Sequence, residues 1–273
     1  MDQGDPAFAA GESLCHRDIL ARLFAPAVRE AVCGEGVTVV RLVSPASRRR
    51  LDLQLSCHDR IERDGELTLA VRDVDTGLIL AGLTFCLVQN AGERIAIIAG
   101  VPAANDPRMR CLVRDVARDL FGLRPKAFVL WCLQQLAMPW GIRQIQAVGD
   151  EQRAGLHCRK GLENAVQHDE FWRESDGREL PGGGGWLLPL RSPCRRREEL
   201  KPSRRRAHER RYSMLAALQP TLVAAFALLA PGPEGTGRIA ARPVEHTCSP
   251  CGTALGAGRA MLTNDLLATN HSF

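Results

Sequence analysis

The segment from residue 106 to residue 150 most constrains what this chain can fold into, because two helix patterns and a strand pattern follow one another within it. Asp106 can accept hydrogen bonds from the first turn of a helix, and Pro107 tolerates the first helical position. Gly122 can adopt a positive φ and ends that helix. The apolar side chains that recur at helical spacing predict its buried side: Met109, Leu112, Val113, Val116 and Leu120.

A second helix is predicted from Pro125 to Met138, after the break GLRPK at residues 122–126. Its apolar side chains lie nearly all round the helix axis, which is typical of a buried helix. Pro139 and Gly141 end it, and residues 142–148 have the alternation of a strand. The centre of the chain is therefore predicted to be helix, turn, buried helix and strand.

Strand patterns precede this centre. Residues 67–72 alternate apolar and small or polar side chains, residues 78–88 form a nearly continuous apolar run, and residues 94–99 return as a third strand. Upstream, residues 17–32 have a helical stripe, and Arg48–Arg50 have the composition of a solvated turn. This order predicts an α+β or α/β fold with a central mixed sheet and flanking helices.

Composition divides the chain into three parts. Residues 1–54 are expected to form an N-terminal helical segment, and residues 55–230 the main domain. Residues 231–273 are rich in Gly, Pro, Ala and Thr without periodicity, which predicts a disordered tail.

Cysteine use and the first residues indicate a reducing compartment. Ten cysteines in 273 residues do not make a disulfide scaffold, and the start MDQGDPAF lacks the basic region of a signal peptide. We therefore expect a cytoplasmic protein. His246, Cys248 and Cys251 supply less than the four ligands of a structural zinc site, so no metal and no cofactor is expected.

Six segments together resemble the bacterial VirK/YbjX family in their order and spacing. They are DGELTLAVRD (64–73), LTFCLV (83–88), GLRPK (122–126), IRQIQAVGD (142–150), HDEFWRE (168–174) and SRRRAHERRYSML (203–215). The chain departs from the family pattern at His168, where the family usually has Tyr, and at residues 100–103, where a Gly-rich turn with Gln is usual.

The resemblance implies a role in virulence, envelope integrity, antimicrobial-peptide resistance or stress responses that include DNA damage. It implies no particular reaction, and no catalytic residue is assigned.

The order of three strands and a helix is also similar to the acyl-CoA-binding core of GNAT N-acetyltransferases. Such a core cradles a pyrophosphate on the backbone N–H groups of a Gly-rich loop. Here that loop is residues 100–106, which contain one Gly and, with Pro102, few free donors. A GNAT-like acyl-CoA-dependent transferase is therefore an alternative function, although the loop at residues 100–106 offers few backbone N–H groups to a pyrophosphate.

The segments GLRPK and HDEFWRE supply the candidate ligand or partner site. Arg124 stands at a rigid corner before Pro125, where a carboxylate partner suits a guanidinium, and we predict pairing with Asp169 or Glu174. The carboxylates of HDEFWRE suit acid–base chemistry, or alternatively face water while Phe171 and Trp172 anchor the segment. The candidate residues are Arg124, Lys126, Asp169, Trp172 and Glu174.

Positive charge is concentrated in one stretch. The net charge is +5, while residues 191–211 hold ten basic and three acidic residues, a local net of +7. Such a run suits the phosphates of anionic lipid, lipopolysaccharide or nucleic acid, although stacking aromatics for nucleic acid are few. The candidate surface residues are Arg204, Arg205, Arg206, Arg210 and Arg211.

The basic run leads into 19 residues without charge, 212–230. A helix packed on the core is the favoured prediction for this segment, and an interfacial or spanning helix is the alternative. Because the neighbouring arginines suit anionic headgroups, we expect a protein that is cytoplasmic or peripheral at the inner membrane. The oligomeric state is left open.

Overall fold

The computed structural model describes residues 16–44, 46–57, 67–101, 107–151, 168–192, 197–199, 201–229 and 244–247. The N-terminal elements are α1 (His16–Leu23), α2 (Pro26–Cys33), β1 (Val37–Val43), β2 (Arg50–Ser56), β3 (Leu67–Asp73), β4 (Ile79–Asn90) and β5 (Glu93–Gly100). The central elements are α3 (Pro107–Asp119), α4 (Pro125–Ala137), β6 (Ile142–Val148) and α6 (His168–Glu174). The last are β7 (Arg178–Glu179), β8 (Gly185–Leu188), a 3-10 turn (Arg197–Glu199), α7 (Pro202–Leu229) and β9 (Val244–Thr247).

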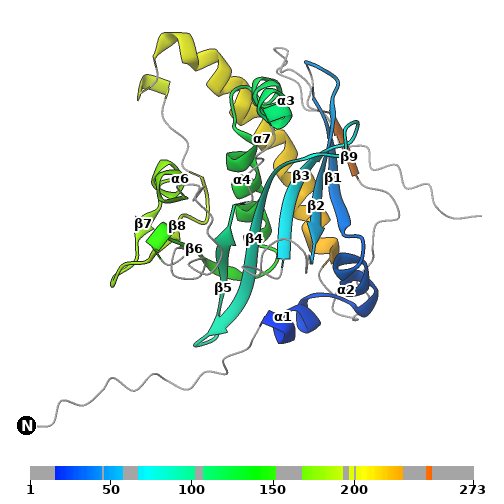
Figure 1. Cartoon of the computed structure of the whole chain (residues 1–273), viewed down its shortest axis with the longest axis vertical. Coiled ribbons are helices and arrows are strands. Elements are labelled where there is room, and N and C mark those ends of the chain that lie inside the picture. The colour runs from blue at the N-terminus through cyan, green and yellow to red at the C-terminus, as the bar shows by residue number, and fades with distance from the viewer. Residues whose placement is uncertain are drawn as a thin grey trace, which may run out of the picture.

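One mixed sheet organises the described chain. Its nine described strands lie in the order β7-β8-β6-β5-β4-β3-β2-β1-β9. The pairs β5–β6 and β1–β9 are parallel, and the other described pairs are antiparallel. Figure 1 shows α6, β7 and β8 gathered at one end of this sheet, with β1 and β9 at the other. The predicted mixed sheet with flanking helices is confirmed, and the fold is α+β.

Strand alternation places the core on one face of the sheet. Leu67, Leu69 and Val71 of β3 are fully buried, and the register sets them beside the fully buried leucines of β2 and beside Phe85 and Leu83 of β4. The helices α4 and α7 pack against this sheet (Figure 1). The prediction that residues 67–72 form a half-buried strand was wrong, because Thr68 and Ala70 on the other side of β3 are buried as well.

The break between α3 and α4 depends on two residues with positive φ. Phe121 has φ 55° and Gly122 has φ 81°, and the Gly122 N–H donates to Ala117 O over 2.7 Å. This geometry is a left-handed helix end, which glycine adopts without strain. Pro125 then starts α4, which is buried from Phe128 to Ala137. The predicted succession of helix, turn, buried helix and strand is confirmed.

The helix α7 joins an exposed first half to a second half that packs one side on the core. Leu215, Leu218, Leu222 and Phe226 of its second half are buried in the core, and the Trp140 Nε1–H donates to the Phe226 carbonyl over 3.2 Å. The favoured prediction for the uncharged segment, a helix packed on the core, is confirmed. The first turns of α7 extend beyond α3 and α4 at the top of Figure 1.

The expected segment boundary at residue 54 falls inside β2, which pairs with β1 and β3 in the common sheet. Arg49, expected in a solvated turn, donates from Nη1 to Asp73 Oδ2 over 2.5 Å, and the Asp73 side chain is fully buried. The expectation of a solvated Arg49 was wrong because its partner is supplied by a strand distant in sequence.

Within residues 231–273, where a disordered tail was expected, the structure describes one short strand, β9. This strand adds to the outer edge of β1, with Val40 opposite Val244 and Val43 opposite Thr247. A sheet edge offers backbone donors and acceptors whatever the side chains of the added strand, so composition gave no signal of the pairing. Residues 231–243 and 248–273 lie outside the described residues.

Candidate functional site

The carboxyl end of β6 and the start of α6 are locked together by two aspartates. Asp150 Oδ1 accepts the His168 N–H over 2.9 Å, and Asp150 Oδ2 accepts the Asp169 N–H over 3.2 Å. In return, Asp169 Oδ1 accepts the Asp150 N–H over 3.1 Å. Asp150 thus caps α6 as an N-cap side chain would, although it comes from another element.

Two tryptophans complete this junction. The Trp186 Nε1–H of β8 donates to Asp169 Oδ1 over 2.8 Å, and the Trp172 Nε1–H donates to the Val148 carbonyl over 3.2 Å. Both indoles are buried. Asp169 and Trp172, two of the predicted site residues, therefore have partners inside the fold, and their arrangement stabilises the joint between β6, α6 and β8.

Arg124 and Glu174 form an exposed ion pair. Arg124 Nη1 lies 3.0 Å from Glu174 Oε2, with side chains 62% and 46% exposed. The predicted pairing of Arg124 with one of two carboxylates is confirmed for Glu174. Because both side chains are largely in water, the pair contributes little to stability and leaves both charges accessible.

Lys126 lies beside this pair, on the first turn of α4. Its Nζ is 4.3 Å from the centre of the Phe171 ring. Burial lowers the pKa of Lys126 and the nearby Arg124 charge lowers it further, while Glu174 and Glu170 act in the opposite direction. The corner GLRPK and the helix α6 therefore present two cations and two carboxylates together, without a buried catalytic pair among these residues.

The basic arm, residues 202–213 of α7, is the most strongly charged helical surface that the structure describes. Arg204, Arg206 and Arg210 are exposed and Arg205 is partly buried. Arg211 differs, because its Nε and Nη2 donate to the Phe121 carbonyl over 3.2 and 3.0 Å. Burial lowers the pKa of Arg211, with Tyr212 acting in the opposite direction. Arg211 was expected at the binding surface and is instead tied to the α3–α4 turn.

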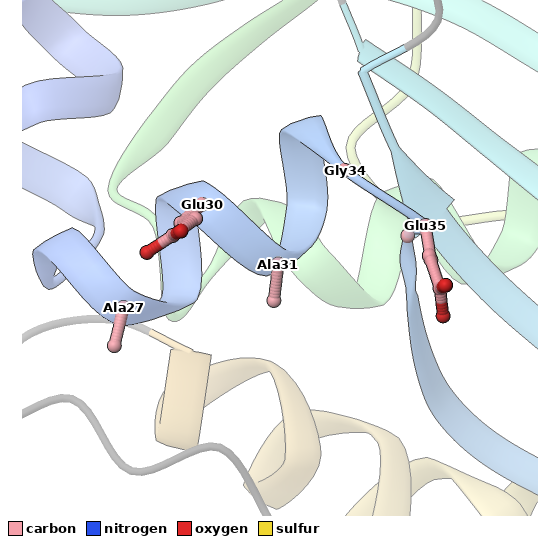
Figure 2. Close-up of a pocket in the computed structure, with 6 residues that line it drawn as sticks. Ala27, Glu30, Ala31, Gly34 and Glu35 are labelled. Carbon is pink, nitrogen blue, oxygen red and sulfur yellow. The ribbon is translucent and has the colours of Figure 1, made fainter.

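A shallow depression of about 420 Å³ lies where α2 meets β1. Figure 2 shows Ala27, Glu30 and Ala31 along α2 and Glu35 at the entry to β1. Its six lining residues include two carboxylates and no cation. The depression is therefore a poor match to a phosphate or to an anionic headgroup.

The parallel ladder between β5 and β6 ends before the strands do. The register runs to Ile98 opposite Ala147, whereas Gly100 pairs onward with Thr84 of β4 and Val148 pairs with Gly185 of β8. The two carboxyl ends thus diverge toward opposite neighbours. The sequence pattern did not predict this, because it depends on which strand inserts beside β6.

Metal ligands do not converge in the described part of the chain, where no group of three or more His, Cys, Asp or Glu side chains is found. Cys248 and Cys251 lie outside the described residues.

One described helix, α7, is long and apolar enough to cross a membrane by length and composition, and 39% of its apolar window is buried inside the protein.

Comparisons with known proteins identify relatives of this chain. The uncharacterized protein YbjX of Escherichia coli (strain K12) is 27% identical over 177 residues, which are 64% of this chain and 53% of YbjX. An uncharacterized protein of Haemophilus influenzae is 23% identical over 213 residues, 77% of this chain and 70% of that protein. The chain thus matches about half the length of YbjX.

Among solved structures, a mutant cAMP-binding acyltransferase from Mycobacterium smegmatis is similar with a TM-score of 0.35 and 8% identity, covering 74% of this chain and 60% of that one. A likeness at that score carries no functional argument. The model of DUF535, a family described as protein of unknown function, matches residues 13–224. Since this match takes in most of the chain and YbjX is a homologue, the protein belongs to the DUF535 family, the VirK/YbjX family that its motifs predicted.

Proposed function

We propose that this protein acts at the anionic cytoplasmic face of the bacterial envelope, in envelope integrity or antimicrobial-peptide resistance, and that the basic arm of α7 holds it there. The observation that carries the proposal is the division of α7. One side of its apolar second half is buried in the core, while its first half projects with exposed Arg204, Arg206 and Arg210.

This division favours electrostatic attachment. The arm of 12 residues is about 18 Å long at 1.5 Å per residue. A helix of that length is only marginally stable alone, so its continuity with the packed half supports it. Five arginines and one glutamate give the arm a net charge of +4. Each cation near an anionic leaflet contributes about 1 kcal/mol, which supports reversible binding.

The packed half of α7 also indicates how the chain meets lipid. Leu218, Leu222 and Phe226 fill the core, so a spanning or deeply inserted α7 requires that core to open. Binding through the arm alone leaves the fold unchanged. The proposal is therefore peripheral attachment at headgroup level.

The test is sedimentation of the purified protein with vesicles of two compositions. Binding is expected to vesicles of phosphatidylcholine with phosphatidylglycerol and to be absent from pure phosphatidylcholine, and it should weaken steeply as salt rises. Equal binding to both vesicle types, or no binding to anionic vesicles at low salt, would contradict the proposal. A salt-dependent affinity for DNA or RNA without vesicle binding would favour the nucleic-acid alternative.

A second candidate, an acyl-CoA-dependent transferase of the GNAT type, is favoured by the divergence of β5 and β6. Ligands of sheets with parallel strands bind where the carboxyl ends of neighbouring strands separate. Here Gly100 and Val148 end two such strands. Isothermal titration with acetyl-CoA tests it, because a transferase binds the acyl donor. The absence of saturable binding would dismiss this candidate without bearing on the vesicle result.

A further inference from the structure

Two cysteines lie together where the end of β2 meets the end of α2. Cys33 is the last residue of α2, and Cys57 follows directly after β2. The Cys57 N–H donates to the Val32 carbonyl over 2.8 Å. The last carbonyls of a helix have no partner within that helix, so this bond joins the C-terminus of α2 to the end of β2. The two cysteines are therefore neighbours in space, although β1 and β2 separate them in sequence.

The same hydrogen bond limits the distance between the two cysteines. The Val32 carbonyl and the Cys33 Cα belong to one peptide unit, and the donor nitrogen is bonded directly to the Cys57 Cα. Standard backbone dimensions therefore keep the two Cα atoms within about 7 Å, and the bend at the hydrogen bond shortens that distance. Disulfides join Cα atoms that are about 4.4–6.8 Å apart, so the backbone of this pair has the spacing of a disulfide.

The state of the two side chains also suits a reversible bond. Both residues are thiols rather than a disulfide in the structure. Cys33 is exposed, so its side chain can change rotamer without disturbing the core. Cys57 is half-buried and packs at the margin of the core. We therefore expect bond formation to require rotation of the Cys33 side chain and little movement of α2 or β2.

A small oxidant can approach this pair from solvent. The shallow depression at α2 is lined by Gly34, Glu35 and Gly36, which follow Cys33 directly (Figure 2). The situation of Cys132 on α4 is the opposite, because it is fully buried and burial raises the pKa of its thiol. A protonated, buried thiol is unreactive, so solvent access favours oxidation at Cys33.

We propose that Cys33 and Cys57 form a reversible disulfide, which makes the pair a redox modification site. The oxidant is a low-molecular-weight disulfide such as oxidised glutathione. The thiolate of one cysteine attacks a sulfur of this disulfide, forms a mixed disulfide and releases one thiol. The thiolate of the second cysteine then attacks the protein sulfur of the mixed disulfide and releases the other thiol. The protein gives up two electrons and two protons, which the oxidant takes up as it becomes two thiols.

The bridge would stabilise one end of the sheet. It closes a loop of about 25 residues that contains β1 and β2, which lowers the entropy of the unfolded chain. It also holds α2 covalently to the end of β2. Disulfides of this kind in a reducing compartment are usually transient and redox-sensing. The inference does not depend on the basic arm or on attachment to the envelope.

The test equilibrates the full chain with oxidised glutathione, blocks the remaining thiols by alkylation and maps unreduced peptides by mass spectrometry. A peptide pair joined through Cys33 and Cys57 is expected, and dithiothreitol should separate it. The oxidised protein should melt about 5 °C higher than the reduced protein, because the closed loop constrains the unfolded chain.

Cys33→Ser should abolish both the joined peptides and the rise in melting temperature. When reduced, this variant should melt as the reduced unaltered protein does, because the replaced side chain is exposed. Cys111→Ser is the matched control, since Cys111 is also an exposed cysteine on a helix, and it should retain both effects. Separate glutathione adducts on Cys33 and Cys57, bridges from either to other cysteines, or thiols that resist oxidised glutathione would overturn the proposal.

Discussion

Asp150 and Asp169 cap each other: the Asp150 N–H donates to Asp169 Oδ1 over 3.1 Å, and the Asp169 N–H donates to Asp150 Oδ2 over 3.2 Å. Each carboxylate thus satisfies the backbone of the other at the point where β6 ends and α6 begins. Two family segments, IRQIQAVGD and HDEFWRE, meet in this exchange. The two aspartates of these segments therefore have a structural role, which is to hold the end of β6 to the start of α6.

This exchange predicts energetic coupling between the two aspartates. Asp150→Ala and Asp169→Ala should each reduce the free energy of unfolding by about 1–2 kcal/mol, the usual cost of a lost helix cap. In the double variant the losses should be less than additive, with a coupling of about 1 kcal/mol measured by urea denaturation. Strict additivity would show that the two carboxylates act separately.

The buried pair Arg49–Asp73 predicts a specific pH dependence. Burial alone would raise the pKa of Asp73, but hydrogen bonds from Arg49 and Thr76 outweigh it and hold that pKa below its usual value. Because the folded pKa is lower than the unfolded one, near 3.9, this stabilisation is present above pH 4 and is lost as the pH falls through the lower, folded pKa.

Asp73→Asn should therefore cost about 3 kcal/mol at pH 7 and flatten the loss of stability below pH 4. Urea denaturation at several pH values measures both effects. Asp75→Asn is the control, because Asp75 pairs with Arg50 at the surface and should change little. If the free energy of unfolding of Asp73→Asn fell below pH 4 as steeply as that of the unaltered protein, Asp73 would not be the cause of the pH dependence.

The exposed pair Arg124–Glu174 should contribute little to stability, unlike the buried pair Arg49–Asp73. Arg124→Ala should alter the free energy of unfolding by less than about 1 kcal/mol, since both partners are largely solvated. Thermal unfolding at low and high salt measures it. A loss of several kcal/mol would mean that the corner GLRPK depends on this pair rather than on Gly122, Pro125 and Arg211.

The strand β9 predicts that part of the C-terminal region contributes to stability. Truncation after residue 230 removes the partner of β1 and should increase hydrogen exchange at Val40–Val43, with a loss of about 1 kcal/mol. Truncation after Thr247 keeps β9 and should match the full chain. Identical exchange in the two truncated forms would show that β9 does not pair with β1 in solution.

The sequence predicted local structure better than it predicted partners. The helices α3 and α4 were predictable because their apolar periodicity and the stops at Gly122 and Pro139 are properties of neighbouring residues. The buried half of α7 was predictable for the same reason. In contrast, β2 was not predicted, and only the distant Asp73 shows why Arg49 is partly buried.

The candidate site was predicted in part. The pairing of Arg124 with a carboxylate followed from a guanidinium at a rigid corner, and the structure selects Glu174. The partnership of Asp150 with Asp169 was not predictable, because it depends on where α6 returns to the sheet. Arg211 was indistinguishable from its neighbours in sequence, and only the position of the Phe121 carbonyl separates it from them.

The most direct test of attachment through the basic arm compares two triple variants of equal charge. Arg204→Gln, Arg206→Gln and Arg210→Gln remove the exposed charges of the arm, and the control replaces the exposed Arg110, Arg114 and Arg118 of α3 in the same way. Sedimentation with phosphatidylglycerol vesicles at low salt should show binding lost in the arm variant and retained in the α3 variant, with both melting temperatures unchanged. Equal binding by the two variants would contradict a role for the arm.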